Sequence, residues 1–289
     1  MCIAFIYVCE DGPYKYIVGS NRDESFDRPA LDVHFWETEP DESLIFAGKD
    51  MEAKGTWLGI RALPVEVMDQ HKLPKFRFAL LTNYREFNPA TDKITRGKLV
   101  TDFLRNDSEH STHIDYGEKL LSTAANYNGY NLILGGYENL LYLSNRSTTC
   151  GILGHGVHGL SNANLNSSWK KVQEGREMFK QAVLSFLEGK EIEEEKLIQE
   201  LLSIMSNKKQ HPDDPNFQNT PDKRNDCYLG LSSIFVEPII FDGRKDYYGT
   251  RSQCIMLVRA DGSIKMTSRN LNIEKSTWDI NSHELKASK

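Results

Sequence analysis

The sequence lacks the features by which membrane-spanning, disulfide-bonded and nucleic-acid-binding proteins are commonly recognised. None of its apolar runs approaches the roughly 20 residues needed to cross a bilayer, so we expect no transmembrane segment. Its five cysteines are an odd number and none belongs to a C-x-x-C pair, which favours free thiols in a reducing compartment. A formal net charge of -6 argues against a nucleic-acid partner, because phosphate binding needs a basic surface.

The first residues, MCIAFIYV, have no basic leader of the kind that begins a secretory signal, and Glu10 and Asp11 interrupt the apolar run. The segment carries acids instead of the arginine-rich helical pattern of a mitochondrial presequence. We therefore expect neither kind of targeting segment here.

Strand-like and helix-like segments follow one another without an internal repeat or a clear boundary, which predicts one domain over 1–289. Strands are expected at 2–8, 14–20, 44–47, 55–60, 76–81, 130–134, 139–143, 227–236, 253–258 and 263–267. Helices are expected at 97–106, 118–125, 193–205 and from a cap at Ser167 or Ser168 to Leu187, and loops at 61–75 and 207–225. Strands at both ends with helices between them predict an α+β fold, in which helices cover the outer faces of antiparallel sheets.

Cys2 stands directly after the initiator methionine, at the start of the first expected strand. Methionine before a small residue is normally removed, and Cys2 would then carry the terminal α-amine, whose reference pKa is about 7.7–8.0. A thiol beside its own amine is a nucleophile with a built-in base. The alternative is a small buried side chain without chemistry.

A charged run, Asn21-Arg22-Asp23-Glu24, closes the second expected strand. A hairpin turn at 10–13 would place Cys2 opposite residues 20–22, within reach of this run. Arg22 can then polarise the thiol and Asp23 can bind the α-ammonium. The alternative is a turn stabilised by a salt bridge.

A set of short motifs in a fixed order resembles the NRDE family, also called the transport and Golgi organization protein 2 family. The motifs are MCI at 1–3, SNRDE at 20–24, RP at 28–29, GTWLG at 55–59, LTNY at 81–84, RG at 96–97, YNGYNL at 127–132, GLSNA at 159–163, Trp169 and GTR at 249–251. The resemblance covers nearly the whole chain. It implies a four-layer αββα sandwich of the N-terminal nucleophile (Ntn) hydrolase type. It also implies a cytoplasmic and mitochondrial protein of haem trafficking and lipid homeostasis.

A more distant resemblance links the chain to cysteine Ntn amidases such as bile-salt and penicillin V acylases. It implies that Cys2 is the nucleophile and that Arg22 and Asp23 are its charged neighbours, although the amidases space these two further apart. It also implies an oxyanion donor at Asn83, a residue that positions the α-amine at Asn162, and a late arginine at Arg251. For each asparagine the alternative is a turn residue.

Aromatic residues and histidines complete the candidates. Trp36, Trp57 and Trp169 can line an apolar pocket or belong to the core. His155 and His158 lie among glycines with no third ligand at zinc-like spacing, which favours a flexible loop and no metal site. The candidate ligand-binding residues are Asn21, Glu24, Trp57, Trp169 and His158.

The haem-trafficking and lipid-homeostasis function rests on the resemblance alone, because the chain has neither a C-x-x-C-H motif nor a Cys-Pro pair. In that function haem or an acyl lipid is the cargo, no cofactor is required, and contact with organelle membranes is transient. The alternative is a cysteine amidohydrolase or acyl thioesterase that uses Cys2. A third interpretation is an interaction protein on a fold that has lost its chemistry.

Overall fold

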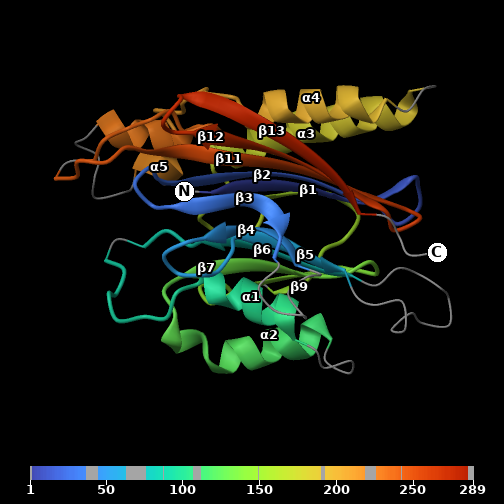
Figure 1. The fold of residues 1–289 in the computed structure, drawn as a ribbon, viewed down its shortest axis with the longest axis horizontal. Helices are drawn as coiled ribbons and strands as arrows, with labels where there is room; N and C mark the ends of the chain where they lie inside the picture. The colour runs from blue at the N-terminus through green and yellow to red at the C-terminus, as the bar shows by residue number, and fades with distance from the viewer. Residues whose placement is uncertain are drawn as a thin grey trace.

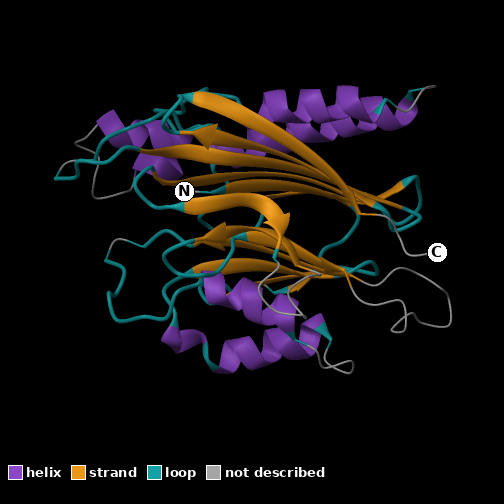
Figure 2. Cartoon of the chain, in the orientation of Figure 1, coloured by secondary structure: helices purple, strands orange, loops and turns teal. Residues whose placement is uncertain are grey.

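Two antiparallel sheets lie face to face and helices cover the outer face of each, giving four layers in the order helix, sheet, sheet, helix (Figures 1 and 2). This computed structural model describes residues 2–36, 45–62, 76–86, 88–106, 112–148, 150–189, 193–218, 226–241 and 243–285. Of the loops expected at 61–75 and 207–225, residues 63–75 and 219–225 lie outside the described residues. The expected α+β class is confirmed.

The first sheet has six strands in the order β10-β1-β2-β11-β12-β13. Their bounds are β1 Ile3–Val8, β2 Tyr14–Ser25, β10 Gly156–Leu160, β11 Tyr248–Arg259, β12 Ile264–Asn272 and β13 Thr277–Leu285. β1 and β2 form the expected hairpin, in which Ile3 pairs with Asn21. This register puts Cys2 opposite Arg22, as the turn at 10–13 predicts.

The second sheet has seven strands in chain order from β3 to β9, so each strand pairs with the next along the chain. Their bounds are β3 Ala30–Phe35, β4 Ile45–Asp50, β5 Leu58–Ala62, β6 Phe76–Asn83, β7 Tyr130–Gly135, β8 Leu140–Ser144 and β9 Gly151–Ile152. The sequence patterns predict neither β3 nor β13. Both are edge strands whose residues are mostly exposed or half-buried, so they carry no apolar period.

Two pairs of helices form the outer layers. The helices are α1 Gly97–Arg105, α2 His113–Ser122, α3 Lys170–Glu188, α4 Glu194–Met205, the short α5 Pro215–Gln218 and the 3₁₀ helices η3 Ala124–Asn126 and η4 Asp226–Ser232. α1 and α2 cover the second sheet, and α3 and α4 cover the first (Figure 1). Among the described residues, no helix is both long enough and apolar enough to span a bilayer.

The alternation of side chains along β1 divides them between two cores. Ala4 and Ile6 pack against the second sheet, whereas Ile3 and Phe5 pack against α3 and α4. Because both faces are buried, the strand reads as a continuous apolar run. By the same period, Cys2 belongs to the face between the two sheets.

The strand expected at 227–236 is wrong, because η4 occupies its first part. The hydroxyls of Ser232 and Ser233 each donate to a backbone carbonyl three residues earlier, at 2.7 Å. Such local bonds compete with the ladder of a sheet. The apolar residues of the segment, Leu231 and Val236, instead form a small cluster of their own.

The flexible loop expected around His155 and His158 is also wrong, because its second half is β10. This strand pairs with β1, where Leu160 faces Ala4. Without it, β1 would present an unpaired edge although both of its faces are buried, and such edges are avoided.

Two helix starts differ from the expected ones. α3 begins at Lys170, after Trp169, and the carboxylate of Asp214 accepts its first backbone N–H at 2.7 Å. Because the capping residue lies in a distant segment, no serine next to the helix marks where α3 begins. α2 begins five residues earlier than expected, at His113, where Thr112 forms a capping box.

Candidate functional site

A pocket of about 500 Å³ opens where β1 begins and where β2 and β6 end, beside the start of α1. It is lined by Cys2, which precedes β1, by residues of the other three elements, and by the end of β4 and the segment that follows it. The residues that the sequence singles out and that line this pocket are Cys2, Arg22, Asp23, Glu24, Trp57 and Asn83.

The charged run that closes β2 is part of the strand and is not a turn. β2 extends to Ser25 because β11 pairs with it, with Thr250 opposite Asp23. Side chains therefore alternate along the run. Asn21 donates to the carbonyls of Met205 at 2.8 Å and Ile234 at 2.9 Å on the helix-covered face. Arg22 points to the face between the sheets.

Cys2 is partly exposed, and its backbone carbonyl accepts a hydrogen bond from Ser161 Oγ at 2.9 Å. Burial raises the pKa of the Cys2 thiol, and the negative charge of Asp23 adds to this. The backbone N–H of Asp23 donates to the sulfur, and this bond and the charge of Arg22 lower the pKa. Burial prevails, so the thiol needs a base to react at neutral pH.

Asp23 is buried beside β11. Its Oδ1 accepts a hydrogen bond from Thr250 Oγ1 at 2.7 Å, and that hydroxyl in turn accepts from the Val236 N–H at 2.9 Å. Burial raises the pKa of Asp23, whereas the charge of Lys171 and the bond from Thr250 lower it. On balance, the pKa of Asp23 is raised above its ordinary value.

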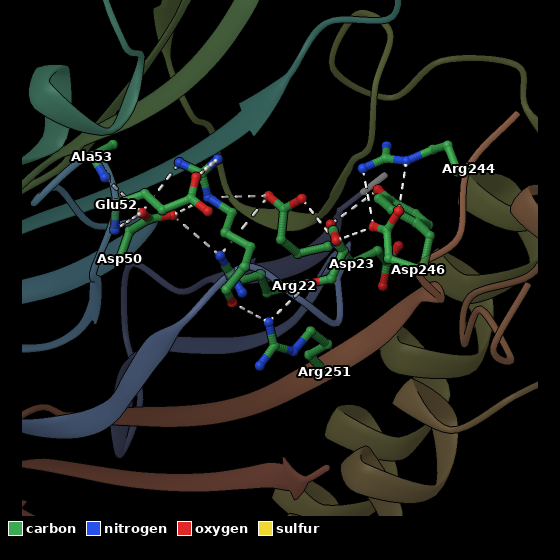
Figure 3. A network of polar contacts seen from close by, with 12 residues as sticks. Arg22, Asp23, Asp50, Glu52, Ala53, Arg244, Asp246 and Arg251 are labelled. Carbon is green, nitrogen blue, oxygen red and sulfur yellow. Dashed lines mark hydrogen bonds and ion pairs between the residues drawn. The ribbon is translucent and has the colours of Figure 1, made fainter. Parts of the chain in front are cut away.

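Arg22 lies between an aromatic ring and a carboxylate. Its guanidinium stacks over the Trp57 ring at 4.3 Å, and its NH2 group lies 3.3 Å from Asp50 Oδ2. Asp50 also accepts two hydrogen bonds from Arg28, at 2.6 and 3.1 Å (Figure 3). Burial alone would raise the pKa of Asp50, but these bonds and the Ala53 N–H hold it below its ordinary value.

Asn83 and Asn162 are neighbours, though they do not play the same part. The Asn83 side chain is exposed and lines the pocket, and Asn162 Nδ2 donates to the Asn83 carbonyl at 2.6 Å. Both residues also line an adjoining cavity of about 190 Å³. Asn162 thus fixes the backbone that carries Asn83, and the next residue back, Ser161, anchors Cys2.

Five predicted site residues do not line the pocket. They are Asn21, Asn162, Arg251, Trp169 and His158. Arg251 donates through NH1 to the carbonyls of Ser25, at 2.8 Å, and of Arg28, which shapes the turn after β2 (Figure 3). Trp169 is buried in the core under α3, and His158 Nε2 contacts the Gly154 carbonyl at 2.8 Å.

Sequence reasoning missed three residues of the site. Asp50 comes from β4, and Arg96 lines both cavities and donates to the Gly129 carbonyl at 3.0 Å. Lys171, which the sequence places on an ordinary helix face, is 1% exposed. Burial lowers the pKa of Lys171 to about 8, against the opposing charges of Asp23 and Cys2. Arg96 belongs to the RG motif and Lys171 follows Trp169 by two residues, but the sequence does not indicate how deeply either side chain is buried.

Within the described ranges, no three or more His, Cys, Asp or Glu side chains are grouped so that they could bind a metal ion. The residues that line the pocket offer a thiol, an amide and charged groups.

Comparison with known proteins gives one family. The model of that family, described as Transport and Golgi organisation 2, matches residues 1–273. The Transport and Golgi organization protein 2 homolog of Bos taurus is 30% identical to this chain over 305 residues, which cover 99% of both proteins. The Mus musculus homolog is 30% identical over 98% of both, and the Drosophila melanogaster protein is 29% identical over 91% of this chain and 90% of its own length.

Proposed function

Because the chain belongs to the Transport and Golgi organisation 2 family and carries Cys2 in the wall of a pocket, we propose that it is a cysteine hydrolase with an N-terminal nucleophile. The substrate class is an acyl amide or an acyl thioester. The αββα order of layers, with the nucleophile at the start of a central strand, supports the assignment of the fold to the Ntn-hydrolase type.

The observation that carries the proposal is the meeting of Cys2, Arg22 and Asn83 in one cavity. These residues come from the starts and ends of three strands, and each contributes a different chemical group. A thiol, a cation and an amide donor are the groups that acyl transfer requires: a nucleophile, a group that favours the thiolate, and an oxyanion donor. A volume of about 500 Å³ accommodates a small-molecule ligand.

The proposed reaction begins when removal of Met1 leaves the α-amine on Cys2. The amine takes the thiol proton, and the sulfur attacks the carbonyl carbon of the substrate, forming a C–S bond. The Asn83 amide donates to the developing oxyanion. Collapse breaks the bond to the leaving amine or thiol, which takes the proton from the α-ammonium. Water, deprotonated by the same amine, then hydrolyses the acyl-enzyme and releases the acid and the thiol.

The surroundings of the thiol support a base of this kind. Burial raises the pKa of Cys2, so few molecules carry a thiolate at pH 7 unless a neighbouring group accepts the proton. Asp23 lies beside the thiol and can bind the α-ammonium that results.

The test joins intact mass measurement with alkylation by iodoacetamide and peptide mapping. We expect that Met1 is absent and that Cys2 is alkylated faster than Cys150, which is exposed and is the matched control. Turnover on a panel of acyl amides and thioesters should fall by on the order of 10³-fold or more in Cys2→Ser and Cys2→Ala, and stay unchanged in Cys150→Ser. A retained Met1, an acylated α-amine, or equal turnover in Cys2→Ala would refute the proposal.

Haem carriage is a second candidate function, and the charges of the same pocket favour it. Lys93 and Arg96 line the pocket and can bind two carboxylates of a flat ligand, while Cys2 can ligate iron. His158 does not line it. Titration with haem should give a saturable Soret shift that Cys2→Ala alters. A titration no different from that of an inert control protein would exclude this function.

Lipid homeostasis, with an acyl lipid as ligand, would follow from either function. Transient contact with organelle membranes and a place in the cytoplasm and the mitochondrion belong to the same proposal. Fractionation of cells that express the tagged chain tests the two compartments.

A further inference from the structure

Lys171 is a buried cation behind the pocket that the proposed reaction does not yet use. It is the second residue of α3 and is 1% exposed, whereas Lys170 beside it is half-buried and binds Asp213 at 2.5 Å. Within the described residues Lys171 has no carboxylate within 4.0 Å, and its Nζ donates to the Leu231 carbonyl at 2.8 Å. The ammonium also lies 5.6 Å from the centroid of the Trp169 ring. A buried ammonium with one carbonyl and one ring as partners is costly unless opposite charge lies nearby.

The position of Lys171 follows from the helical period. It falls on the same face of α3 as Val172, Gly175 and Phe179, which packs on β1 and β10. Asp23 stands on the side of the first sheet that α3 and α4 cover, two residues along β2 from Asn21. The segment of Leu231 connects the two, since Val236 donates to the Thr250 hydroxyl that binds Asp23.

The charges around Lys171 come from four segments. Asp23 of β2 is the strongest, Cys2 and Asp214 add to it, and Arg85 after β6 opposes it. Burial lowers the pKa of Lys171 to about 8, and the acids limit that fall. In return, the charge of Lys171 lowers the pKa of Asp23. At neutral pH the ammonium is therefore mostly present beside two acids of the site.

We propose that Lys171 is a positioning residue, whose buried positive charge keeps Asp23 ionised and favours the Cys2 thiolate. This inference rests on the proposed hydrolase function. Removing the charge takes away one of the causes that lower the pKa of Asp23, and it makes the negative form of the thiol less favourable. The side chain does not line the pocket, so it acts through these two groups and touches no substrate.

The test is the pH profile of Cys2 alkylation by iodoacetamide, read at the Cys2 peptide between pH 6 and 10. In Lys171→Met we expect the midpoint to move to higher pH and the rate at pH 7 to fall about threefold, since one charge is lost near the thiol. Lys171→Arg keeps the charge and should restore most of the rate. Lys170→Met, the matched control, should match the wild type.

A second measurement does not depend on folding of Lys171→Met. The lysine ¹³Cε signals of wild type and Asp23→Asn, followed against pH, give the pKa of Lys171 directly. The expected value of about 8 should fall further in Asp23→Asn, because the anion that raises it is gone. An unchanged Lys171 pKa in Asp23→Asn, or an unchanged alkylation profile in a folded Lys171→Met, would overturn the inference.

The two proposals fail in different ways. If Cys2 of the wild type reacts no faster than Cys150, the hydrolase proposal is wrong. The NMR measurement then still decides whether the charges of Asp23 and Lys171 are coupled, because it does not depend on the reactivity of Cys2. If Cys2 is highly reactive and Lys171→Met has the wild-type profile, only the role of Lys171 is wrong.

Discussion

Asp50→Asn is the substitution that most directly tests how the charged wall of the pocket is built. Asp50 Oδ2 accepts from Arg28 Nε at 2.6 Å and from Arg22 NH2 at 3.3 Å, and Oδ1 accepts from the backbone N–H groups of Glu52 and Ala53 at 3.1 and 2.9 Å. Asparagine has the same shape but can keep an oxygen at only one of the two positions. If it keeps Oδ1, its NH₂ group faces two guanidinium donors.

The expected cost follows from these contacts. Each hydrogen bond to a charged group contributes about 1.5–3 kcal/mol, and removing one partner of a buried ion pair costs about 3–5 kcal/mol. Arg28 is 29% exposed, so solvent compensates part of the loss. We expect the free energy of unfolding to fall by about 3 kcal/mol, which for a chain of this size lowers Tm by about 5 °C.

The pH dependence gives a second, independent readout. The pKa of Asp50 in the folded protein lies below its ordinary value, so its stabilisation is complete above the unfolded pKa of about 3.9 and is lost as the pH falls through the folded value. The difference in stability between wild type and Asp50→Asn should therefore be constant from about pH 5 to 8 and shrink below about pH 4.

Urea unfolding and thermal melts monitored by circular dichroism measure both effects. Asp102→Asn is the matched control, because Asp102 pairs with Lys98 at 2.6 Å on an exposed helix face. Such pairs contribute no more than about 0.5 kcal/mol. If Asp50→Asn costs as little as Asp102→Asn, or if its effect is the same at pH 3 and pH 7, the reasoning is refuted.

Two further substitutions test the packing around the site. Gly175→Ala should destabilise the protein by about 1–3 kcal/mol, because the added Cβ would stand 2.1 Å from Phe5 Cζ, and this outweighs the helix preference of alanine. Gly151→Ala is the control: the position has open space around it, so stability should change by less than about 0.5 kcal/mol in the same melts. Asn21→Ala should cost about 2 kcal/mol by leaving two buried carbonyls unpaired, while the alkylation rate of Cys2 stays unchanged; a slower Cys2 would show that Asn21 acts on the pocket.

The part of the site that sequence reasoning predicts is the part that is local in the chain. One hairpin brings Cys2 to the end of β2, and its register follows from a turn a few residues away. Asp50 and Lys171 reach the same place from β4 and α3, and no local pattern indicates that a lysine on a helix is buried. The edge strands β3 and β13 could not be predicted either, because exposed strands lack the alternation of apolar and polar residues that marks a half-buried strand.

The adjacency of Arg22 and Asp23 also explains how this chain departs from the amidases that it resembles distantly. Consecutive residues of a strand point to opposite faces, so the two side chains cannot stand side by side at the thiol. Arg22 lies with Cys2 between the sheets, where Trp57 and Asp50 fix it. Asp23 reaches the sulfur through its backbone N–H, while its carboxylate lies toward α3 and binds the Thr250 hydroxyl. A carboxylate on that face lies toward the helical layer, and this is the layer that supplies Lys171, whose charge lowers the pKa of Asp23.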